Sequence, residues 1–183
     1  TPSPDRGIAL AILTGNLSLR NVKSSFFKQL TIQHVDETLF KLSYDYVGDL
    51  GETVALIWPF LKKEGDLPNL SNLIKILNET KKTNLPETVE NLLTISEPHE
   101  RWALIKIATG GLRIGVSARL AKTALAKMGN QDLQDIEEIW HGLEPPYDNL
   151  FQWLSGDTKK PIIKHTETFH PLMLSNPIDE RKD

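Results

Sequence analysis

The sequence contains no cysteine among its 183 residues, which excludes disulfide bonds and thiolate metal sites. It also has no run of about 18 apolar residues, so no membrane-spanning helix is expected. Its first seven residues lack the basic and apolar regions of a secretory signal. We therefore expect a cytoplasmic protein that does not contact a membrane.

Two common nucleotide-binding motifs are also missing. A Walker loop ends in Gly-Lys-Ser or Gly-Lys-Thr, and neither triplet occurs in the sequence. The dinucleotide fingerprint follows a strand, whereas residues 97–108, which precede the glycine-rich segment, are predicted to be helical. The five histidines are scattered without an i, i+4 pair, so no metal site is predicted. No catalytic residues are predicted either, because no Ser/His/Asp grouping follows from the spacing.

Helical periodicity dominates the sequence. Leu70, Leu73, Ile74 and Leu77 recur at i, i+3, i+4 and i+7, which gives one helix a continuous apolar face. No pair of alternating strands is present, and no internal repeat is obvious. We predict an all-α, irregular multi-helix fold, with helices over residues 5–13, 22–30, 36–43, 49–58, 69–82, 86–95, 98–108, 117–128, 132–143 and 147–154.

The character of the sequence changes near residue 155. Residues 1–154 are predicted to form the helical domain. Residues 155–183 are rich in turn-forming and β-branched residues, are interrupted by prolines and show no helical face. We interpret them as an extended linker that leads to a further domain.

The segment TGGLRIGVSARLAK is the strongest functional signal. Gly110, Gly111 and Gly115 surround Arg113, and Ser117 is a good N-cap for the helix that follows. Glycine permits positive φ and lets backbone N–H groups approach a ligand closely. The first turn of a helix also presents unpaired N–H groups with a partial positive charge. The segment therefore predicts a phosphate-binding site.

The charge distribution favours DNA as the source of that phosphate. The formal net charge is −3, yet residues 101–130 contain six basic and no acidic residues, and residues 131–150 contain six acidic and no basic ones. Arg20 and Lys23 belong to a second stretch without acidic residues. One basic face on an acidic domain is typical of a DNA-binding surface, although solvated surface helices also carry such charges.

Four blocks in order resemble the N-terminal DNA-binding domain of bacterial ATP-dependent DNA ligases. They are RGIALAILTGNLSLR, LSYDYVGDLGETVALIWP, TGGLRIGVSARLAKTALA and IWHGLEPPYDNLFQWL. In addition, FHPLML near the end resembles the strand that enters the adenylation domain of that family. The resemblance covers nearly all of the chain, which begins inside the family pattern, so we expect the first helices of the domain to be absent.

The resemblance implies a monomeric all-helical domain that lies across the minor groove of nicked duplex DNA at the nucleoid. The same polypeptide would carry adenylation and OB-fold domains, which use ATP and Mg²⁺ to seal the nick in replication, repair or recombination. The family's nucleophilic lysine lies in a Lys-x-Asp-Gly motif, which this sequence lacks. The chain alone is therefore expected to bind DNA without catalysis and without a cofactor.

The match also implies roles for individual residues. The three glycines would bring N–H groups onto a phosphate, and Arg113 would bind a phosphate or enter the minor groove. The remaining candidates would add hydroxyl, N–H or charge contacts. The DNA-binding set is Gly110, Gly111, Arg113, Gly115, Ser117, Arg119, Lys122, Arg20 and Lys23.

Two other functions remain open. A helical protein-interaction scaffold would explain the amphipathic helices and would be indifferent to DNA. A nucleotide-binding enzyme would use the glycine-rich loop for ATP and would bind the free nucleotide. Asp49 and Glu52, which could be read as catalytic carboxylates, are expected to stabilise the start of a helix instead.

Overall fold

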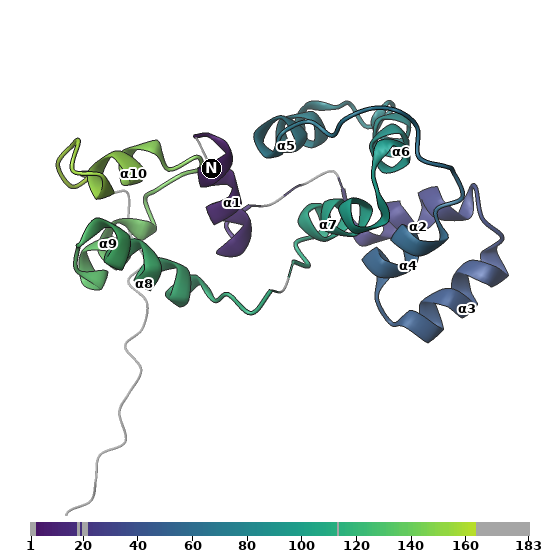
Figure 1. Cartoon of the computed structure of the whole chain (residues 1–183), viewed down its shortest axis with the longest axis horizontal. Coiled ribbons are helices and arrows are strands. Elements are labelled where there is room, and N and C mark those ends of the chain that lie inside the picture. The colour runs from purple at the N-terminus through teal and green to yellow at the C-terminus, as the bar shows by residue number, and fades with distance from the viewer. Residues whose placement is uncertain (1–2, 18, 20–21, 113, 164–183) are drawn as a thin grey trace, which may run out of the picture.

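The computed structural model describes residues 3–17, 19, 22–112 and 114–163, and these contain ten helices and no strand (Figure 1). The predicted all-α fold is confirmed, and each predicted helix is present, α1 with the predicted ends and the others with one or both ends shifted. None of the helices in this part of the chain could span a bilayer. The helices are α1 (Asp5–Leu13), α2 (Ser24–Ile32), α3 (Glu37–Val47), α4 (Leu50–Ile57), α5 (Leu70–Glu79), α6 (Leu85–Ile95), α7 (Pro98–Thr109), α8 (Ala118–Gly129), α9 (Leu133–Trp140) and α10 (Asp148–Leu154).

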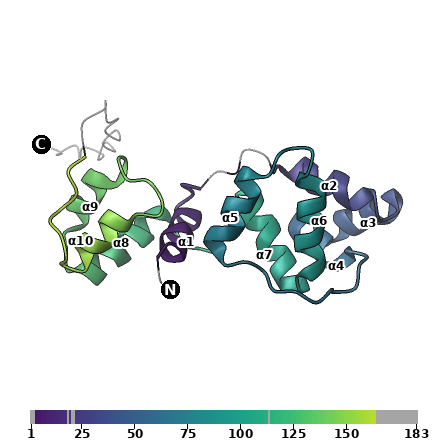
Figure 2. The ribbon, with the colours of Figure 1, turned by 90° about the horizontal axis from the view of Figure 1, so that it is seen from above.

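The helices form two lobes, each with its own apolar core (Figures 1 and 2). The first lobe contains α2 to α7 and buries Phe27, Phe40 and Leu104. The second lobe contains α1 and α8 to α10, and buries Ile136 and Leu150. The chain therefore starts in the second lobe, crosses to the first after α1, and returns after α7.

Helix α1 belongs to the second lobe but also contacts the first. A Cβ at Gly7 would lie 1.7 Å from the carbonyl oxygen of Pro146, so α1 can pack this closely only with glycine there. On the other side, the Asp5 carboxylate accepts a 2.9 Å hydrogen bond from the N–H of Ser71 in α5. One short helix thus links the two lobes directly.

Residues 155–163, predicted as the start of a linker, lie against the second lobe. Lys160 forms ion pairs with Asp135 (2.7 Å) and Glu138 (2.6 Å) on α9. These carboxylates raise the pKa of the Lys160 ammonium, which is only slightly desolvated. Ile163 packs on the second-lobe core and against Gly142, where a Cβ would lie 2.2 Å from Ile163. The rest of the predicted linker, residues 164–183, lies outside the described residues.

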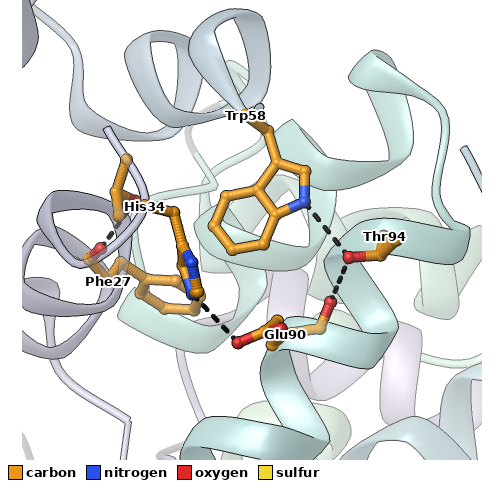
Figure 3. A network of polar contacts seen from close by, with 6 residues as sticks. Phe27, His34, Trp58, Glu90 and Thr94 are labelled. Atoms are coloured by element: carbon orange, nitrogen blue, oxygen red, sulfur yellow. Dashed lines mark hydrogen bonds and ion pairs between the residues drawn. The ribbon is translucent and has the colours of Figure 1, made fainter. Parts of the chain in front are cut away.

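A polar network stabilises the first lobe at the end of α4 (Figure 3). The indole Nε1 of Trp58 donates to Thr94 Oγ1 (3.3 Å), and the Thr94 hydroxyl donates to the carbonyl of Glu90 (2.7 Å). The Glu90 carboxylate lies 3.0 Å from Nε2 of His34, whose ring meets the edge of Trp58. Trp58 and Thr94 are both buried, so the indole N–H depends on the threonine hydroxyl as its acceptor.

We expect Thr94→Val to lower the free energy of unfolding by about 1–3 kcal/mol, because it leaves a buried donor without an acceptor while preserving shape. Urea denaturation followed by circular dichroism measures this. The matched control is Thr123→Val on α8, where an exposed hydroxyl also donates one turn back, to the carbonyl of Arg119 (2.9 Å). It should change stability by less than about 0.5 kcal/mol. Equal losses in both variants would contradict this account of the network.

Candidate functional site

Two connections run between the lobes in opposite directions, and they begin alike. The connection from α1 to α2 starts with residues 14–17 (TGNL), and the connection from α7 to α8 starts at the corresponding residues 109–112 (TGGL), of which Thr109 is the last residue of α7. The glycine of each turn has left-handed backbone geometry, with φ of 73° at Gly15 and 70° at Gly110. Each turn thus ends a helix at a position that favours glycine.

Three hydrogen bonds of the two turns are also the same, and the first turn has a further one, from the N–H of Leu17 to the carbonyl of Ala11 (3.2 Å). In each turn, the glycine N–H donates to the carbonyl three residues back, the next N–H donates to the carbonyl five residues back, and the threonine hydroxyl donates to the carbonyl four residues back. The first turn has Gly15 to Ile12 (3.2 Å), Asn16 to Ala11 (2.8 Å) and Thr14 to Leu10 (2.8 Å), and the second has Gly110 to Ile107 (3.3 Å), Gly111 to Lys106 (2.8 Å) and Thr109 to Ile105 (2.7 Å).

The connections end alike as well. Val22 is buried in the first lobe and Val116 packs on the core of the second. The residue after each valine is an extended N-cap, Lys23 for α2 and Ser117 for α8. The structure therefore repeats one arrangement, in which a helix ends in a glycine turn and the next helix begins after a valine and an extended N-cap. This arrangement was not obvious from the sequence, in which the two segments share little beyond TGNL and TGGL.

Four of the predicted DNA-binding residues lie together at the start of α8. Gly115 and Ser117 are exposed just before the helix, and the Ser117 hydroxyl oxygen accepts from the N–H of Leu120 (3.1 Å). Arg119 is exposed in the first turn, and the ammonium of Lys122 lies 5.4 Å from the ring centre of Trp140.

The other predicted residues are divided between the two connections. Lys23 is exposed at the start of α2. Arg20 and Arg113 lie outside the described residues, one in each connection. The predicted DNA-binding residues therefore belong to two separate connections between the lobes.

The roles expected of Gly110 and Gly111 change with the structure. Their N–H groups already donate to carbonyls at the end of α7, so they shape the turn and do not offer these donors to a phosphate. Gly115 has a positive φ of 77° and no atom within 4 Å of a Cβ placed there. It remains the glycine at which a ligand can approach the backbone closely.

Two of the six basic residues in the segment 101–130 are not free on the surface. The Arg101 side chain is buried, its Nε donates to the carbonyl of Leu93 (2.6 Å), and burial lowers the pKa of its guanidinium. Lys106 forms an ion pair with Asp49. Charge counted along the sequence therefore overstates the basic surface.

Asp49 has the predicted capping role and a second one. Its carboxylate accepts from the N–H of Glu52 (2.9 Å) at the start of α4, and it also binds the ammonium of Lys106. Burial raises the pKa of Asp49, but the hydrogen bonds from Lys106 and the Glu52 N–H outweigh burial and hold it below its ordinary value of 3.8. The pair therefore stabilises the fold at neutral pH, and this contribution is lost as the pH falls through that lowered pKa.

Two neighbouring cavities lie where the connections reach the first lobe. One, of about 290 Å³, lies between the first connection and the end of α7, and the other, of about 390 Å³, is lined by the Asp49–Lys106 pair. The smaller is lined by Leu17, Leu19, Val22, Lys23, Ser24, Ala108, Thr109 and Gly110, and the larger by Ser24, Asp49, Leu50, Gly51, Trp102, Ile105, Lys106, Thr109 and Gly111.

No protein-family model matches this chain, and no curated protein or solved structure is significantly similar to it. Within the described part of the chain, no three His, Cys, Asp or Glu side chains are grouped as metal ligands would be. The function must therefore be argued from the two connections, the cavities and the exposed basic residues.

The repeat makes a quantitative prediction about its two turns. Gly15→Ala and Gly110→Ala should each lower the free energy of unfolding by about 1–2 kcal/mol, because both place a Cβ at positive φ in open space. Gly111→Ala is the control, since φ is not positive there and a Cβ would meet neighbours at an ordinary 3.5 Å. Thermal and urea unfolding measure all three variants. A large loss at one turn with none at the other would show that the turns are not equivalent.

Proposed function

We propose that this chain is the DNA-binding domain of an ATP-dependent DNA ligase and binds nicked duplex DNA through its phosphates. The observation that carries the proposal is the repeat of two equivalent connections that run in opposite directions between the lobes. The strands of a duplex are also antiparallel. A protein with two oppositely directed copies of one binding element can present the same groups to both strands.

The chemistry of the exposed residues suits phosphate binding. One connection leads to Lys23, Ser24 and Ser25 at the start of α2, and the other leads to Ser117 and Arg119 at the start of α8, all of them exposed. Lysine, arginine and serine side chains, together with N–H groups at helix starts, are the usual donors to DNA phosphates. Phosphate contacts carry no sequence information, and a ligase must seal nicks in any sequence.

The four sequence blocks that resemble the ligase family support the same function. Two of them, RGIALAILTGNLSLR and TGGLRIGVSARLAKTALA, contain the two turns of the repeat. The sequence has no Lys-x-Asp-Gly motif, so in this proposal the adenylation and OB-fold domains, with ATP and Mg²⁺, perform the chemistry. This chain holds the DNA on which they act.

The proposal is tested by fluorescence anisotropy of a labelled nicked duplex at several salt concentrations. Lys23→Gln, Arg113→Gln and Arg119→Gln should each weaken binding uniformly across DNA sequences and reduce the salt slope by about one, because each removes one phosphate contact. Lys75→Gln is the control, since this exposed lysine lies on α5, outside both connections. It should leave the affinity and the slope near the wild-type values.

Three results would contradict the proposal. The folded chain would fail to bind duplex DNA even at low salt, or bind it without salt dependence, or lose no more affinity in the three variants than in Lys75→Gln. A protein-interaction scaffold would give the first result. Titration with free ATP by calorimetry identifies the nucleotide-binding alternative, which we expect to show no heat of binding.

A further inference from the structure

The larger cavity holds a lysine that the sequence placed with the basic surface and that the structure shows already paired. Lys106 lies in the last turn of α7, and its carbonyl accepts from the N–H of Gly111 in the glycine turn (2.8 Å). Its ammonium contacts the Asp49 carboxylate, and 18% of the lysine side chain and 33% of the aspartate side chain are exposed. The pair therefore lines the cavity and is partly accessible to solvent, and the backbone of Lys106 is hydrogen-bonded to the glycine turn.

Two hydroxyl side chains and the indole of Trp102 also line this cavity. Ser24 at the start of α2 and Thr109 at the end of α7 line it together with the pair. The Thr109 hydroxyl already donates to the carbonyl of Ile105, so the Lys106 ammonium and the Ser24 hydroxyl are the donors that suit a phosphate oxygen. Among the residues that line this cavity, Asp49 alone carries a negative charge, and that charge neutralises Lys106.

The free-energy cost of separating Lys106 from Asp49 is low, because the Asp49 carboxylate keeps a second hydrogen-bonding partner. Its carboxylate also accepts from the N–H of Glu52 and caps α4, where the helix dipole favours a negative charge. The lysine ammonium is a compact charge on a flexible stem and can move between two acceptors. A phosphate oxygen and a carboxylate oxygen compete for it on similar terms.

We propose that Lys106 binds one backbone phosphate of the duplex in this cavity, and that Asp49 holds the lysine side chain in place while no DNA is bound. This inference rests on the proposed function and assigns a specific phosphate site to it. It follows that Asp49 lowers the affinity for DNA. Its negative charge competes with the phosphate for Lys106, and it repels the phosphate once the phosphate is bound.

The inference is tested with the whole 183-residue chain and the nicked duplex in the same anisotropy titration. Asp49→Asn keeps the cap, since asparagine is as good an N-cap as aspartate, but removes the competing charge. We expect binding at least about threefold tighter at an unchanged salt slope, because Lys106 makes the same phosphate contact in both proteins. Lys106→Gln added to Asp49→Asn should abolish the gain in affinity and make the salt slope shallower by about 0.9, because one phosphate contact is lost.

Asp36→Asn is the matched control for charge and for capping. Asp36 caps α3 by accepting from the N–H groups of Thr38 and Leu39, and its substitution changes the net charge by the same amount. It should change the affinity by less than about twofold, because screened charges away from the site contribute little. Asp49→Ser, which also preserves a capping oxygen, repeats the main test in case the asparagine variant is poorly folded.

Each outcome decides the inference. Equal affinities for Asp49→Asn and Asp36→Asn, or weaker binding by an Asp49→Asn variant that is fully folded at the temperature of the titration, would overturn it and leave the pair a purely structural contact. If the gain persists after Lys106→Gln, Lys106 is not the phosphate ligand and the inference fails. A wild-type chain that binds no duplex would refute the proposed function as well, so the two failures are distinguishable.

Discussion

The double crossing of the chain between two lobes is the constraint on which the rest of the molecule depends. Each lobe has its own apolar core, and the second can close only when α8 to α10 return to pack with α1. In both crossings the chain must therefore end one helix within a single turn, pass from one lobe to the other and begin a new helix. A left-handed glycine, an anchoring valine and an extended N-cap meet these demands in each crossing. Because the backbone arrangement is repeated, each crossing ends at the N–H groups of a helix start, those of α2 in the first crossing and those of α8 in the second.

The two crossings are equivalent in backbone but not in side chains. Lys106, which precedes the second turn, corresponds to Ala11 before the first, because each carbonyl accepts from the residue after the turn glycine. The N-cap position after the first connection is a lysine, whose side chain makes no capping hydrogen bond, and the N-cap position after the second is a serine, whose side chain does. In our account, the competition between Asp49 and a phosphate is therefore confined to one crossing, and the two DNA strands are held by similar but unequal contacts.

The sequence predicted the ten helices because their apolar spacing and caps are local properties. Asp49 and Ser117 cap helices in the structure as expected. The repeat was missed although TGNL and TGGL could be read in the sequence, because the helices around them share little else. The burial of Arg101 and the pairing of Lys106 could not be predicted, since their partners, Leu93 and Asp49, are brought to them by tertiary packing.

The central claim is that the two connections contact both strands of one duplex, and hydroxyl-radical footprinting tests it most directly. A nicked duplex is labelled on each strand in turn and bound to the chain at low salt. The account predicts protection of both strands on either side of the nick, across one minor groove. Lys23→Gln should weaken one of the two protected sets and Arg119→Gln the other. Protection of a single strand, or the same loss of protection in both variants, would contradict the claim.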